Sequence, residues 1–99
     1  MSFIDFAKQA MALPDAWSSS VVGEVGPARI KVLRMDQRPY PEESHTSNEA
    51  LIVIDGKLEL DVEGEALTVA SGEMYVVAAG TPHRVREGSY GTLVIVDLQ

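Results

Sequence analysis

The chain has 99 residues, 45% of them hydrophobic, which suits one globular domain with a modest core, and no apolar run is long enough to span a membrane. Fifteen acidic residues against eight basic ones give a net charge of −7, which disfavours a nucleic acid partner because its phosphates would be repelled. No cysteine is present, which excludes disulfides and thiolate sites, and we expect a cytoplasmic protein because the amino terminus also lacks the features of a secretory signal.

Residues 1–16 are predicted to form a short helical segment. Ser2 can cap the helix, with Asp5 three residues later, and Pro14 is expected to end it. Four apolar residues recur at helical spacing and are expected to pack against the rest of the protein: Phe3, Phe6, Ala7 and Ala10.

Residues 17–99 follow a β pattern. Leu58, Leu60 and Val62 alternate with charged residues, as in a strand with one buried face. Asp55-Gly56 is predicted to form a two-residue hairpin turn into this strand from residues 51–54. About eight short strands with turns between most of them predict an all-β sandwich or barrel. The other expected strands lie near residues 21–25, 28–33, 67–69, 74–77, 83–86 and 92–98.

Two expected strands, residues 51–54 and 93–96, are apolar on both faces. Strands of this kind are covered on both sides. The opposite sheet would cover one face, and either the helix or a second subunit would cover the other. A homodimer is therefore expected.

His45 and His83 are the two histidines of the chain, and each adjoins a turn. In extended backbone, side chains of one parity point to one face, so Glu43, His45 and Glu49 would face inward together. His83 shares its parity with Val85 and faces inward if that valine does. Two imidazoles with one or two carboxylates make a site for a divalent first-row metal ion. Each histidine taken alone is more typical of a surface or hydrogen-bonded residue.

Two segments resemble the sequence motifs of the cupin superfamily. In residues 43–56, His45 is similar to the second histidine of the first motif, and Glu49 is similar to its glutamate, with six residues between Glu49 and Gly56. In residues 72–87, Gly72 begins the second motif, and His83 stands at its histidine, after Pro82.

The resemblance implies one cupin domain over residues 1–99, with a single cupin-type β-barrel (a double-stranded β-helix, or jelly roll) over residues 17–99. It also implies one bound divalent transition metal ion (Zn, Fe, Mn, Ni or Co), with His45, Glu49 and His83 as ligands.

The sequence departs from the motifs at several positions. Glu43 stands where the family has its first histidine, so this residue is either a fourth ligand through oxygen or a side chain that points into solvent. Ala78 replaces a proline and Glu87 replaces an asparagine, and neither of those family residues is a ligand.

Two functions follow from the resemblance, because cupins include dioxygenases, isomerases, epimerases and lyases as well as binding proteins. The first is a metalloenzyme that acts on a small polar organic molecule, such as a carboxylate or a sugar. The alternative is a non-catalytic binding or sensing module for such a molecule, with or without a metal. A purely structural homo-oligomer is a third reading. Three tyrosines are candidate acid–base groups because a phenol can transfer a proton: Tyr40, Tyr75 and Tyr90.

Overall fold

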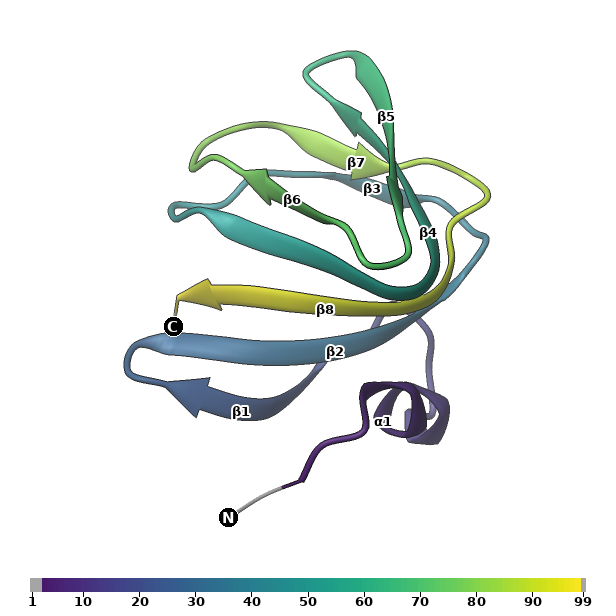
Figure 1. Ribbon diagram of the computed structural model, residues 1–99. Coiled ribbons are helices and arrows are strands. Elements are labelled where there is room, and N and C mark those ends of the chain that lie inside the picture. The colour runs from purple at the N-terminus through teal and green to yellow at the C-terminus, as the bar shows by residue number, and fades with distance from the viewer. Residues whose placement is uncertain (1–2, 99) are drawn as a thin grey trace.

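The computed structural model describes residues 3–98, which form a curled antiparallel sheet with one short helix on its outside (Figure 1). The all-β class predicted from the sequence is confirmed. In chain order the elements are α1 (Phe6–Ala12), β1 (Ser20–Val25), β2 (Ala28–Asp36), β3 (Tyr40–Glu43), β4 (Glu49–Val62), β5 (Glu65–Ala70), β6 (Met74–Val77), β7 (His83–Val85) and β8 (Tyr90–Leu98).

Helix α1 begins after Asp5, whose carboxylate accepts a hydrogen bond from a backbone N–H of the first turn. The Asp5 side chain accepts a hydrogen bond from the Lys8 backbone N–H at 3.1 Å, a cap that contributes about 1 kcal/mol. The predicted cap at Ser2 lies outside the described residues. The helix ends at Ala12, two residues before Pro14. Within residues 3–98, no helix has the length and hydropathy that crossing a membrane requires.

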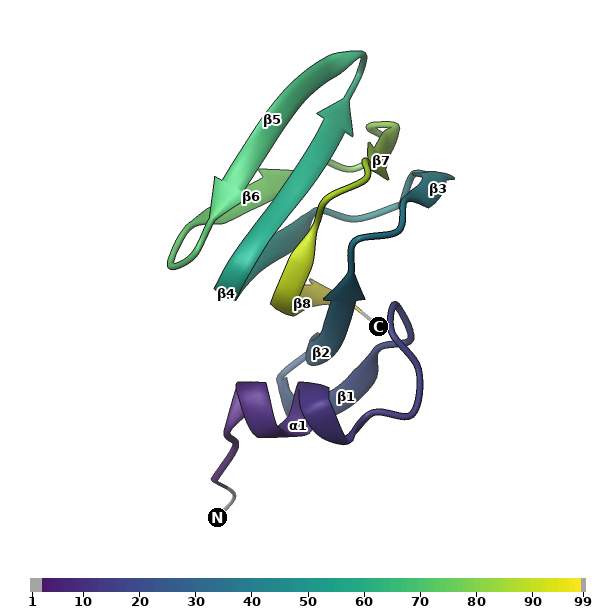
Figure 2. The same cartoon turned by 90° about the vertical axis from the view of Figure 1, so that its right-hand side faces the viewer.

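Only part of the predicted apolar face of α1 is used for packing. Ala10 is buried and Phe6 is half-buried, and both contact the outer side of the sheet (Figure 2). Phe3 and Ala7 are exposed instead, so the predicted packing of those two residues is wrong.

The sheet has the order β1-β2-β8-β4-β7-β3, and β5 and β6 also pair with β4. The long strand β4 pairs with four other strands of this curled sheet. Its first part, from residue 49, pairs with β6 on one edge and β8 on the other. Its last part, to residue 62, pairs with β5 and β7. One strand therefore joins β6 and β8 at its start to β5 and β7 at its end.

The hairpin predicted at Asp55-Gly56 is wrong, because β4 continues through both residues. The register of β4 against β8 shifts between Val53 and Asp55, as in a β-bulge. Gly56 has φ +79°, and a Cβ atom at this position would lie 2.0 Å from the Tyr90 carbonyl oxygen. The glycine is needed because two strand backbones approach closely where β4 bends.

The hairpin that joins β4 to β5 lies eight residues later, at Glu63-Gly64. Both residues have positive φ, 51° and 84°, which is the backbone of a type I′ turn. Val62 and Glu65 pair across this turn.

The core has two parts, one on each side of the sheet. The inner part lies inside the curl and includes Leu58, Leu60 and Val53, none of which has measurable exposure. The outer part lies between the sheet and α1 and consists of Ala10, Val32 and Val94, with Phe6, Val22, Ile30, Ile52, Ile54 and Val96 packed against it. The helix thus covers part of the second face of β4 and β8, as their two-sided apolar sequences predicted.

Candidate metal centre and adjoining cavity

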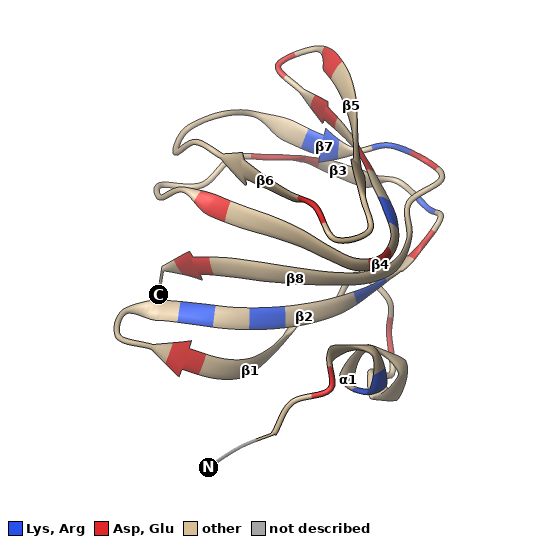
Figure 3. Ribbon diagram, in the orientation of Figure 1, with Lys and Arg blue, Asp and Glu red and all other residues tan. Residues whose placement is uncertain are grey.

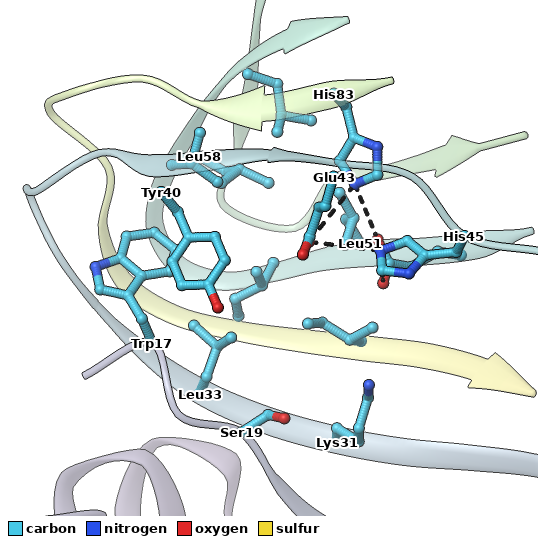
Figure 4. Close-up of a pocket in the computed structure, with 15 residues that line it drawn as sticks. Trp17, Ser19, Lys31, Leu33, Tyr40, Glu43, His45, Leu51, Leu58 and His83 are labelled. Carbon is cyan, nitrogen blue, oxygen red and sulfur yellow. Dashed lines mark ion pairs between the residues drawn. The ribbon is translucent and has the colours of Figure 1, made fainter. Parts of the chain in front are cut away.

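Four potential ligands come together at one end of the barrel interior. Glu43 is the last residue of β3, Glu49 is the first of β4, and His83 is the first of β7, whereas His45 lies in the connection between β3 and β4. One ligand atom from each of the four lies within 4.8 Å of the other three. The structure therefore brings together all four residues that the sequence singled out (Figure 4).

The distances between these atoms suit a shared central ion. The Nε2 atom of His45 lies 3.4 Å from Glu43 Oε1 and 3.5 Å from Glu49 Oε2. The Nε2 atom of His83 lies 3.4 Å from Glu49 Oε1 and 3.8 Å from Glu43 Oε1. With metal–ligand bonds of about 2.1 Å, neighbouring ligand atoms are separated by about 3.0 Å at right angles and about 3.4 Å at tetrahedral angles. The atoms are thus spaced like ligands.

Both imidazoles turn an unpartnered nitrogen to the centre of this group. His45 Nε2 and His83 Nε2 are buried and have no hydrogen-bond partner among the described residues. His83 Nδ1 lies 3.0 Å from the Thr81 carbonyl oxygen, which can only accept, so Nδ1 carries the hydrogen. The Nε2 atom of a neutral His83 then has a free lone pair. Metal-ligating histidines commonly donate their other ring N–H to a backbone carbonyl in this way.

The loop that carries His45 is fixed by backbone contacts with the turn before β7. The Gly80 N–H donates to the His45 carbonyl oxygen at 2.7 Å, and the Ala79 N–H donates to Asn48 Oδ1 at 2.9 Å. Residues 44–48 are not a strand, so the parity that predicted three inward side chains does not apply to that segment. These loop contacts position His45 instead.

The carboxylates differ in exposure. The Glu49 side chain is 7% exposed, and that of Glu43 is 43% exposed. With neutral imidazoles, the ionised group carries two negative charges, one of them on the buried Glu49. A buried carboxylate that lacks a cation or hydrogen-bond donors is costly, so a divalent ion would compensate the charge of this group.

A cavity of about 170 Å³ adjoins these four residues. Leucines, valine and isoleucine of the inner core form much of its wall. Trp17 and Tyr40 lie together on one side, with their ring centroids 5.8 Å apart, and Lys31 and Ser19 lie on the β2 side (Figure 4). For scale, an apolar cavity of about 150 Å³ accommodates benzene. The cavity therefore suits a small organic molecule.

Trp17 is held in the cavity wall by contacts that offset an unfavourable backbone. Its φ is 63°, a left-handed conformation that is uncommon for a bulky residue. Its backbone N–H donates to the Arg34 carbonyl oxygen at 2.9 Å, and its indole N–H donates to Asp36 Oδ1 at 2.6 Å. These bonds orient the ring beside Tyr40.

The sequence reasoning did not identify three residues of this cavity: Trp17, Ser19 and Lys31. They precede both motif regions, and no motif spacing singles them out. Of the three candidate tyrosines, Tyr40 lines the cavity, whereas Tyr75 and Tyr90 do not.

Comparison with known proteins agrees with this architecture. A family model described as "Cupin domain" matches residues 34–98. A cupin-2 domain containing protein from Shewanella frigidimarina is 23% identical, with a TM-score of 0.88, and the match covers 97% of this chain and 94% of that one. Protein NMB1881 from Neisseria meningitidis is 22% identical, with a TM-score of 0.85, and the match covers 99% and 100%. These likenesses show the fold.

One curated relative has a named activity. Quercetin 2,3-dioxygenase from Bacillus subtilis is 41% identical over 49 residues, which make up 50% of this chain. The match spans 14% of the length of that relative.

Proposed function

Because the chain belongs to the cupin family, we propose that it holds one divalent transition metal ion with His45, Glu49, His83 and Glu43, and that it acts on or binds a small polar organic molecule in the adjoining cavity. The observation that carries the metal assignment is the pair of buried, unpartnered Nε2 atoms that face the buried carboxylate of Glu49. The mixed nitrogen and oxygen donors suit Zn, Fe, Mn, Ni or Co.

When bound, such an ion supplies Lewis-acid chemistry or activates oxygen. The chain itself supplies enclosure and orientation. The buried side chains of Leu58 and Leu60 give the cavity an apolar wall, and polar contacts beside such a wall are stronger than in water. The phenol of Tyr40 is the candidate that could hold or move a proton beside a bound molecule.

A non-catalytic binding module is the alternative function. Outside the four ligands, the described cavity wall offers only Tyr40 and Lys31 as groups that exchange protons. Catalysis by general acid–base chemistry would therefore depend on very few side chains. A turnover assay with the metal-loaded protein separates the two functions once a ligand is known.

Elemental analysis of the purified, untagged protein tests the metal assignment, with His45→Ala as the comparison. About one equivalent of metal in the wild type and its loss in the variant would support the proposal. A wild type that takes up no metal after incubation with each of the five ions would contradict it.

Two further proposals concern the setting of the protein. We propose a cytoplasmic location, which the absence of cysteine supports. We also propose a homodimer, for which exposed apolar side chains on the outer face of the sheet offer contact surface: Met74, Val76 and Leu98. Sedimentation analysis measures the oligomeric state.

A further inference from the structure

The cavity contains a single cationic side chain. Lys31 is the only lysine or arginine among the described residues that line it. The residue lies on β2, whose inward-facing neighbour Leu33 belongs to the inner core. The Lys31 side chain is 16% exposed, so most of it is shielded from bulk water. In Figure 4, Lys31 and Ser19 lie on the opposite side of the cavity from His83.

Asp97 positions the Lys31 ammonium group but does not fully neutralise it. Its Nζ atom lies 2.7 Å from Asp97 Oδ2, and Arg29 Nε lies 3.3 Å from Asp97 Oδ1. Basic residues also stand out along β2 in Figure 3. One carboxylate is thus shared by two cations, and the three residues together carry one net positive charge.

The ionisation of Asp97 agrees with this arrangement. Burial raises the pKa of Asp97, but the Lys31 and Arg29 side chains outweigh it, so the pKa lies below its ordinary value. The carboxylate therefore stays ionised at neutral pH. It fixes one side of the Lys31 ammonium, which still has further N–H donors for a second acceptor.

The remaining charges make Lys31 important for an anion. A divalent ion with two carboxylate ligands is formally neutral, and the protein as a whole carries a charge of −7. Neither provides the long-range attraction that a net positive charge gives to an anion. A single ammonium group in a partly desolvated wall can instead provide the attraction, since charge-assisted hydrogen bonds strengthen away from water.

We propose that Lys31 is a specificity-determining residue that binds the carboxylate of a small organic acid, with the body of the acid lying against Trp17 and Tyr40. The inference rests on the proposed binding of a small molecule in the cavity and chooses a carboxylate rather than a neutral sugar. One lysine offers a point charge for a monoanion, whereas phosphate sites typically combine several donors.

Trp17 provides the readout. It is the only tryptophan of the chain and lines the cavity, so its fluorescence reports what binds there. Metal-loaded protein is titrated with benzoate and acetate, and each acid is compared with its neutral amide, benzamide or acetamide. We expect at least one acid to bind more tightly than its amide, and Lys31→Met to weaken its binding by about tenfold or more.

The variants separate the charge of Lys31 from its structural role. Lys31→Met leaves Asp97 paired with Arg29, so no buried carboxylate is left alone. Lys31→Arg keeps the charge and should keep the preference. Lys57→Met is the matched control, because it removes the same charge from β4 at a residue that does not line the cavity.

Metal content is measured on the same samples. A failure of the Lys31 proposal can then be distinguished from a failure of the metal assignment. The inference stands if the acid preference disappears in Lys31→Met while its metal content equals that of the wild type. Retention of the preference in His83→Ala, which has lost the metal, adds support when Lys31→Met has lost the preference. It is overturned if neither acid is preferred over its amide in the wild type. A preference that survives in Lys31→Met would also overturn it, and its loss with the metal in His83→Ala would then assign the carboxylate to the metal.

Discussion

Glu49 Oε1 lies 3.4 Å from His83 Nε2, and these two side chains, 34 positions apart in the sequence, are the most buried of the four candidate ligands. They begin two different strands, β4 and β7, so the barrel itself sets their separation. A site built on paired strands is more rigid than one built on loops. These two residues therefore form the fixed half of the candidate metal centre, and Glu43 and His45 complete it.

His83→Ala should abolish stoichiometric metal binding and leave a folded barrel. The substitution removes a buried donor whose Nδ1 is already committed to Thr81, and no other described side chain near β7 replaces it. Elemental analysis together with circular dichroism measures both properties. A folded variant with full metal content would show that His83 is not a ligand.

Glu49→Gln should weaken metal affinity more than Glu43→Gln. The Glu49 carboxylate is shielded from water, where its charge acts strongly on an ion, whereas the Glu43 side chain is 43% exposed. We expect a loss of about 100-fold or more for Glu49→Gln and about tenfold for Glu43→Gln, by comparison with changes to groups that support metal ligands. Competitive titration with a metal-binding dye measures both. The reverse order would mean that Glu43 is the dominant carboxylate.

Gly56→Ala should destabilise the fold by about 4 kcal/mol or more, among the larger effects of single substitutions. The new Cβ would meet the Tyr90 carbonyl oxygen, which belongs to a paired strand and cannot move freely. Gly64→Ala is the matched control: its φ is also positive, but nothing lies within 4 Å of the added atom. That change should cost only the left-handed strain, about 1–2 kcal/mol. Urea denaturation gives both values, and equal losses would argue against the close contact.

Acid should loosen the environment of Trp17. The Arg38 side chain lowers the pKa of Asp36 from its ordinary value of 3.8, burial opposes this, and the Trp17 indole bond lowers it further. Because the folded pKa is depressed, the stabilisation is present above 3.8 and is lost as the pH falls through the folded pKa.

Trp17 emission measured from neutral pH into acid follows this loss. We expect a change below pH 3.8 in the wild type, and we expect Asp36→Asn, which cannot ionise, to lack that step. An identical acid transition in the variant would assign it to another group.

The alternation of Leu58, Leu60 and Val62 was sufficient to predict a half-buried strand, because each pleat places alternate residues on one side. The candidate ligands were found because His45, Glu49 and His83 match motif positions. Asp55-Gly56 misled the prediction, since the same dipeptide suits a hairpin or a bulge. The choice depends on Tyr90, a residue of another strand, and local sequence does not carry that contact.

The cavity residues could not be found from the sequence for a related reason. Lys31 lies in a predicted strand, but its position as a half-buried cation depends on Asp97 of the neighbouring strand β8, which it shares with Arg29. Trp17 reads as the first residue after a helical segment. Its position depends on Asp36 and on the pairing of its backbone with Arg34.

Because β4 pairs with β5, β6, β7 and β8, it cannot detach from the sheet without breaking its pairs with all four strands. We expect the barrel to unfold in one cooperative step, with the amides of β4 among the slowest to exchange with solvent. Most contacts in this topology join distant parts of the chain, so formation of the sheet should be slow compared with that of a helical domain of equal length. Glu49 and His83 then come together only after the barrel has closed, so a metal ion held by the candidate site would bind late in folding.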